Sequence, residues 1–118
     1  MEKVPDPKSL RAIDNMIQNI TQRKPSECTN ITEVRDEIDR IDHWLIKLLS
    51  QRFEYVKEVV KYKENNPGSI QAPKRRMEVI KCRRQWAEEN GLDPDVIEEM
   101  YSRLIQYFID EEMKIKNL

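Results

Sequence analysis

Two cations interrupt an otherwise apolar row of residues in the first half of the chain. The row follows alternating steps of four and three residues: Val34, Ile38, Ile41, Leu45, Leu48, Arg52, Tyr55 or Val56, Val59 and Lys63. This spacing describes one face of a helix turned toward a partner. A cation among packed apolar side chains is costly unless an anion meets it. The row therefore predicts either that the apolar face ends at Arg52 and Lys63 or that the helix holds an anion there.

A third cation, Arg35, and one carboxyl group, Glu112, complete the candidate set. Glu112 interrupts a second apolar row, formed by Ile97, Tyr101, Leu104 or Ile105, and Phe108. Three cations suit a small dicarboxylate, because the arginine guanidinium matches a carboxylate at two points. The alternative is that Arg35 and Lys63, near the ends of their helix, extend into water, and that Glu112 pairs with an arginine.

The composition indicates one helical domain and excludes several classes of partner. The chain has 118 residues, of which 36% are charged, 38% are hydrophobic and 2 are glycine, a mixture typical of helical, soluble proteins. A net charge of -1 argues against general nucleic-acid binding. The first residues lack a secretory signal, and no segment is apolar enough to span a membrane. We therefore expect a cytoplasmic protein with no membrane partner.

Metal and cofactor sites are not expected. Cys28 and Cys82 are far apart in the sequence and form no metal-binding pair, and His43 is the single histidine, so a zinc site is improbable. His43 falls off the apolar row and is interpreted as a surface residue. The chain has no glycine-rich phosphate loop and no nucleophile elbow. An enzyme with this composition would act by stabilising charge.

Proline, glycine and asparagine divide the chain into helices. We predict a short helix over about residues 8–21, a very long helix from Asn30 or Thr32 to about residue 64, and an exposed loop over 65–71. A second helix starts at Pro73 and ends at Asn90, and a third is capped by Asp93. The long helix measures roughly 45 Å at 1.5 Å per residue, longer than a domain of this size. A second copy of the chain is the simplest source of a covering surface.

Four stretches resemble the all-helical chorismate mutase family, in particular its isochorismate-pyruvate lyase branch. They are residues 34–42 (VRDEIDRID), 51–57 (QRFEYVK) with Tyr62 and Lys63, 70–75 (IQAPKR) and 86–93 (WAEENGLD). The resemblance implies an all-α, three-helix protomer with one very long N-terminal helix, in an intertwined homodimer. It assigns residues 26–118 to the chorismate mutase-like domain and leaves residues 1–25 as an N-terminal extension.

The resemblance also implies roles for individual residues. Arg35 would cross into the site of the other protomer, and Arg52 would bind a substrate carboxylate. Lys63 and Glu112 would act on the ether oxygen whose bond to carbon breaks, and Ile109 would line the substrate site. Lys74 stands where relatives often have a glutamate that contacts a substrate hydroxyl, so this position departs from the family. Glu112 replaces a glutamine and can donate a hydrogen bond only when protonated.

The activity implied is pericyclic and requires no covalent intermediate. The leading hypothesis is a lyase that releases pyruvate from isochorismate to give salicylate, with weak mutase activity. The rival hypothesis is a chorismate mutase that forms prephenate. A third reading is a non-catalytic helical dimer, which does not explain why Arg52, Lys63 and Glu112 all interrupt apolar rows.

Overall fold

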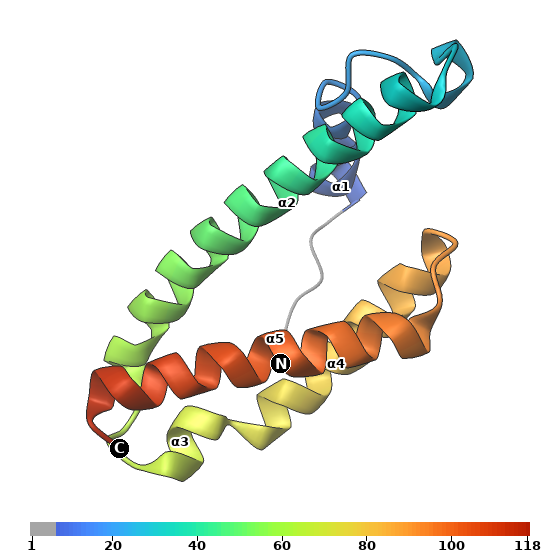
Figure 1. The fold of residues 1–118 in the computed structure, drawn as a ribbon. Coiled ribbons are helices and arrows are strands. Elements are labelled where there is room, and N and C mark those ends of the chain that lie inside the picture. The colour runs from blue at the N-terminus through green and yellow to red at the C-terminus, as the bar shows by residue number, and fades with distance from the viewer. Residues whose placement is uncertain (1–6) are drawn as a thin grey trace. The chain divides into compact units, whose positions relative to one another are not determined.

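The computed structural model describes residues 7–118 of the chain, and all regular elements in this part are helices (Figure 1). The α-helices are α1 (Pro7–Ile17), α2 (Ile31–Val59), α3 (Pro67–Gln71), α4 (Pro73–Glu89) and α5 (Pro94–Lys116). The residues form two compact units, one ending at Arg52 and the other comprising Phe53–Leu118. The continuous helix α2 contributes residues to both. The predictions of an all-helical fold and of one very long helix are confirmed. The predicted end near residue 64 is wrong, because α2 ends at Val59 and Lys63 has extended backbone angles.

In the first unit, side-chain hydrogen bonds fix the start of α2. Asn30 Oδ1 accepts from the backbone N–H of Glu33 at 2.9 Å, and Glu33 Oε1 accepts from the backbone N–H of Thr29 at 2.8 Å. These bonds satisfy amide groups that have no partner inside the helix. The hydroxyl and amide groups of Thr29 also lower the pKa of the Glu33 carboxyl group. The predicted start near Asn30 is confirmed.

The connection between α1 and α2 is held by the carboxylate of Glu37, which is buried. Glu37 Oε2 accepts from the backbone N–H groups of Gln22 at 2.8 Å and Arg23 at 2.6 Å, and Oε1 accepts from Arg40 Nε at 2.8 Å. The Arg23 amide and Arg40 outweigh the opposing effect of desolvation and lower the pKa of Glu37. The segment preceding α2 is therefore attached to that helix by a charged hydrogen-bond acceptor.

The apolar row of α2 is widely exposed in this unit. Its members range from 42% exposed at Val34 to 51% exposed at Leu45. Together with Ile17, Ile20 and Cys28, the row lines an apolar groove. A run of exposed large apolar side chains on one helix face is typical of an interaction surface.

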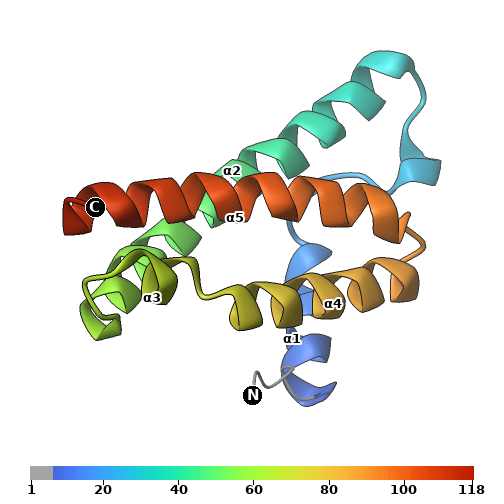
Figure 2. The same cartoon turned by 90° about the horizontal axis from the view of Figure 1, so that it is seen from below.

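In the second unit, α4 and α5 lie side by side and antiparallel (Figures 1 and 2). Arg76 donates to Gln106 Oε1 at 3.0 Å and to the carbonyl of Ser102 at 3.1 Å. Near the other end, Arg84 donates to Asp95 Oδ1 at 2.9 Å and to Glu98 Oε1 at 3.0 Å. The helix pair forms the frame on which the site described below is built.

The turn between α4 and α5 is formed by the glycine, aspartate and proline that predicted it. Gly91 has a φ of 73°, a conformation that favours glycine. Asp93 Oδ1 accepts from the backbone N–H of Asp95 at 2.8 Å, and Pro94 is the first residue of α5. The predicted end of the second helix and start of the third are both confirmed.

The prediction of an exposed loop over residues 65–71 is wrong. The segment contains α3, whose N-cap Asn66 accepts from the backbone N–H of Ser69 at 2.8 Å, and the side chain of Ile70 is fully buried. The Pro67-Gly68 pair suggested a chain break, but proline is equally suited to the first position of a helix. Because Ile70 is buried, α3 is a packed element of the second unit.

The core of the second unit combines aliphatic side chains with Phe108, and further aromatic rings pack at its edge. Phe53 and Phe108 are stacked with ring centroids 5.3 Å apart, and Tyr107 lies 5.0 Å from Phe108. Phe108 and Ile109 are buried, as are Val60, Val79 and Ala87. The core fixes the face of α5 that carries Glu112 one turn later. None of the helices described for this chain is long and apolar enough to cross a membrane.

Candidate active site

Lys63 and Glu112 form an ion pair in the second unit. Lys63 follows the short 3-10 helix η2 (Val60–Tyr62), and its backbone N–H donates to the carbonyl of Val60 at 3.1 Å. Its ammonium donates to Glu112 Oε1 at 2.8 Å and to the carbonyl of Ile70 at 3.0 Å. The pair joins the end of the long helical segment to α3 and α5.

The two members of the pair differ in exposure, and the more exposed Lys63 is the one that can reach a ligand. The side chain of Glu112 is 5% exposed and that of Lys63 is 20% exposed. An ammonium has three N–H donors, and the two acceptors above leave one for a ligand oxygen. A hydrogen-bond donor with a fixed charge in a partly buried place can stabilise negative charge that develops on a bound molecule.

Two further predicted site residues belong to this unit. Ile109 is buried and lies three residues before Glu112, on the same side of α5. Lys74 lies in the first turn of α4 and is exposed. It follows Ala72, which has the left-handed backbone angles φ 41° and ψ 63°. The structure thus brings together Lys63, Glu112 and the carbonyl of Ile70, and it places Lys74 at the start of the next helix.

The remaining two predicted residues, Arg35 and Arg52, belong to the first unit. Both are on α2, Arg35 exposed near its start and Arg52 partly buried. They are separated by 17 positions of one continuous helix, which corresponds to roughly 25 Å along its axis at 1.5 Å per residue. Two groups that far apart on one helix cannot both contact the same small dicarboxylate.

Two contacts of the site were not anticipated from the sequence. The carbonyl of Ile70 is a backbone group, so its residue type carries no signal. Lys116 donates from Nζ to the carbonyl of Lys63 at 3.3 Å. It lies four residues after Glu112, and this spacing is the sequence signal that places both side chains on one face of a helix.

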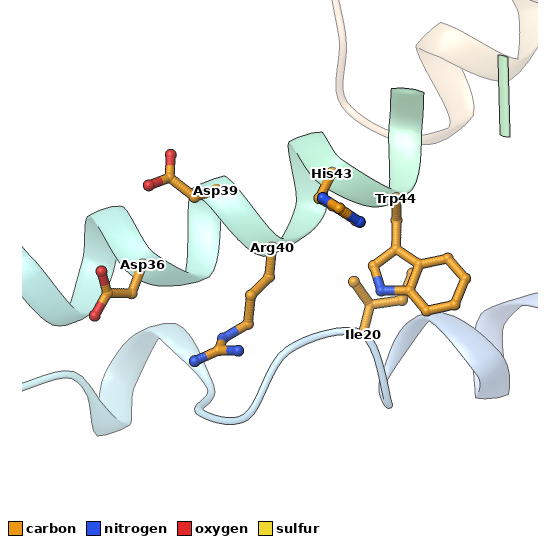
Figure 3. A pocket seen from close by; sticks show the side chains of 6 residues that line it. All are labelled: Ile20, Asp36, Asp39, Arg40, His43 and Trp44. Atoms are coloured by element: carbon orange, nitrogen blue, oxygen red, sulfur yellow. The ribbon is translucent and has the colours of Figure 1, made fainter. Parts of the chain in front are cut away.

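A hollow on α2, separate from the apolar groove described above, is lined largely by charged and polar side chains (Figure 3). Asp36, Asp39, Arg40, His43 and Trp44 line it together with Ile20. The two carboxylates would repel an anionic ligand. In the described part of the chain, no cluster of three or more histidine, cysteine, aspartate or glutamate residues could hold a metal ion. His43 is exposed, as predicted. None of the predicted site residues lies here.

Comparison with known proteins agrees with the motifs. The family model described as chorismate mutase type II matches residues 34–113. The isochorismate pyruvate lyase of Pseudomonas aeruginosa is 36% identical over 92 residues, which cover 78% of this chain and 90% of that protein. The T-proteins of Enterobacter agglomerans and Haemophilus influenzae are 37% and 36% identical over 76 residues, or 64% of this chain.

The extent of these matches differs. This chain spans 20% of the length of either T-protein, whereas it spans nearly the whole of the lyase. The family match covers the part of the chain from α2 to α5, including Lys63 and Glu112. The chain therefore belongs to the chorismate mutase type II family of enzymes.

Proposed function

We propose that this protein is an isochorismate-pyruvate lyase that forms salicylate and pyruvate, with weak chorismate mutase activity. The observation that carries the proposal is the Lys63–Glu112 pair with a free donor position on the ammonium. The extent of the match to the Pseudomonas lyase supports the choice of reaction. Residues 26–118 are the catalytic domain in this proposal, and residues 1–25 are an extension.

The reaction needs positioned charges and no nucleophile. Arg52 would bind a carboxylate of the substrate, and Ile109 would provide an apolar surface that keeps the substrate compact. Lys63 would donate to the ether oxygen while its bond to the ring carbon breaks and hydrogen moves to the departing pyruvate. Negative charge grows on that oxygen, and a preformed ammonium stabilises it without reorganisation.

We also propose that the active form is a homodimer in which Arg35 reaches the site of the other protomer. The separation of Arg35 and Arg52 by roughly 25 Å along α2 supports this arrangement, because one protomer cannot bring both to one substrate. The exposed apolar row of α2 supports it as well. Covering that row with a second copy removes a large apolar area from water.

Chorismate mutase activity is the second candidate. The description of the family model favours it. The same charges would serve, because that rearrangement also breaks a carbon–oxygen ether bond. Lys74 and Glu112 are the two departures that bear on the choice. A cation at position 74 in place of a carboxylate changes how a substrate hydroxyl is recognised.

A non-catalytic helical dimer is the remaining alternative. It gives no reason to bury a carboxylate at position 112 and to bring Lys63 to it from 49 residues away. Replacing such a pair by apolar residues is often neutral or stabilising, so stability alone does not require it.

The test is incubation of the purified protein with isochorismate while salicylate and pyruvate are measured. The proposal expects both products in equal amounts and a large loss of both in Lys63→Ala. Formation of prephenate from chorismate, with no salicylate from isochorismate, would move the assignment to the mutase.

A further inference from the structure

We propose that Lys116 is a positioning residue that holds the backbone of Lys63 so that the Lys63 ammonium meets its targets. The inference rests on the proposed function, in which Lys63 stabilises the departing oxygen. Lys116 Nζ donates to the carbonyl oxygen of Lys63 at 3.3 Å. Lys63 is thereby held at both ends, through its carbonyl by Lys116 and through its ammonium by Glu112 and Ile70.

The backbone of Lys63 needs such support because it leaves the regular helix. Lys63 is the residue that ends η2, with φ -99° and ψ 149°. Because the helix does not continue past Lys63, the carbonyl of Lys63 does not accept a hydrogen bond from a later helical N–H. A shift of this peptide would move the ammonium, and misplacement by about 1 Å can cost two orders of magnitude in rate.

The end of α5 is built to keep Lys116 in place. Asn117 adopts the left-handed angles φ 57° and ψ 42°. Its N–H donates to the carbonyl of Lys114 at 3.2 Å, and the N–H of Leu118 donates to that of Met113 at 2.9 Å. This pair of bonds is the Schellman motif, which closes a helix firmly. Lys116 is also partly buried, which restricts its side chain.

The simpler interpretation is that Lys116 only stabilises the negative end of the α5 helix dipole. Lys114 separates the two interpretations. It lies in the same last turn, is 73% exposed at its side chain and pairs with Glu111 at 3.1 Å. A dipole effect would be shared by both lysines, whereas only Lys116 contacts Lys63.

The experiment compares Lys116→Met, Lys116→Arg and Lys114→Met with the unchanged protein. Steady-state kinetics with isochorismate should show kcat reduced about tenfold in Lys116→Met, equivalent to the loss of one hydrogen bond from a charged group. KM should change far less. Lys116→Arg keeps a donor and should recover most of the rate, and Lys114→Met should behave as the unchanged protein.

Hydrogen–deuterium exchange provides a readout that does not depend on turnover. Residues 60–71 should exchange faster in Lys116→Met than in Lys114→Met, because the hold on Lys63 is lost. Equal exchange in this segment, or an equal loss of kcat in the two variants, would overturn the inference. If the unchanged protein converts neither isochorismate nor chorismate, the proposed function fails, and the exchange data still decide whether Lys116 holds Lys63.

Discussion

The ammonium of Lys63 lies 2.8 Å from Oε1 of Glu112, a carboxyl group that is 5% exposed. The two residues are 49 positions apart in the sequence, and they join the end of the α2 segment to α5. A charge pair with one nearly buried member costs desolvation energy. A role of the pair in stabilising negative charge on a bound substrate accounts for this cost.

Lys63→Ala should reduce kcat/KM by roughly 100- to 1000-fold, the usual cost of removing one charged group that stabilises a developing oxyanion. The free energy of unfolding should also fall, by about 3–5 kcal/mol, because Glu112 is left as a buried carboxylate without its cation. Kinetics and urea unfolding measure the two effects. A variant that retains turnover would refute the assigned role of Lys63.

Glu112→Gln should keep most of the activity, because glutamine preserves the hydrogen bond that Glu112 makes. The amide oxygen of glutamine can accept from the Lys63 ammonium as Glu112 Oε1 does, and its amide nitrogen can donate to the ether oxygen of the substrate. Glu112→Ala leaves the Lys63 ammonium without this acceptor and should lose far more of kcat. Steady-state kinetics of the two variants test the prediction, and an equal loss of kcat in both would contradict it.

Glu37→Gln should loosen the segment before α2 and lower the thermal midpoint. The Arg23 amide, the Gln22 amide and Arg40 hold the pKa of Glu37 below its ordinary value. A lowered pKa in the folded state means that this stabilisation is complete above the ordinary glutamate pKa, about 4.3, and is lost as the pH falls through the folded-state pKa.

Melting curves from neutral pH down to about pH 3, a range chosen to span the ordinary glutamate pKa, measure this effect. The difference between Glu37→Gln and the unchanged protein should shrink as the pH falls. Asp36→Asn, at the neighbouring exposed position, is the matched control and should leave the midpoint unchanged. A difference that is constant over this range would show that the charge of Glu37 is not what holds the segment.

Ala72→Gly should be neutral or slightly stabilising. Ala72 joins α3 to α4 with a φ of 41°, and the left-handed region costs a residue with a side chain roughly 1–2 kcal/mol. Glycine relieves this strain but loses about 0.5–1 kcal/mol through its greater freedom in the unfolded chain. Ala87→Gly, at a buried position in α4, should destabilise by about 1 kcal/mol or more. Chemical unfolding of both variants measures the change in the free energy of unfolding that each substitution causes.

Mixing two inactive variants tests the shared site. Arg35→Ala and Arg52→Ala should each abolish most activity. If Arg35 acts in the site of the other protomer, a mixed dimer contains one intact site, and random mixing should restore about a quarter of the original activity. A mixture that remains as inactive as its components would exclude the crossing arrangement.

The long elements could be predicted because their signals are local. No glycine occurs within α2, α4 or α5, and proline occurs there as the first residue of α4 and of α5 alone. Pro73 marks the start of α4, and Asp93 and Pro94 mark the start of α5. The short helix α3 was missed because Pro67-Gly68 can either break a chain or open a helix, and only the burial of Ile70 decides between these.

The site was predicted to a lesser extent, because its contacts are tertiary. Lys63 and Glu112 were identified as polar interruptions of apolar rows, and the structure places them in contact. The buried role of Glu37 was missed, since an acidic residue near a helix start is usually explained by the helix dipole. Its partners are backbone amides of a preceding segment, which no residue pattern reveals.

The most direct measurement is the ratio of kcat/KM for isochorismate to that for chorismate, determined on one preparation of the protein. Salicylate and pyruvate are followed for the first substrate and prephenate for the second. The account predicts a ratio well above one, with both activities strongly reduced by Lys63→Ala. A ratio below one would contradict the lyase assignment, and activity that survives Lys63→Ala would contradict the mechanism.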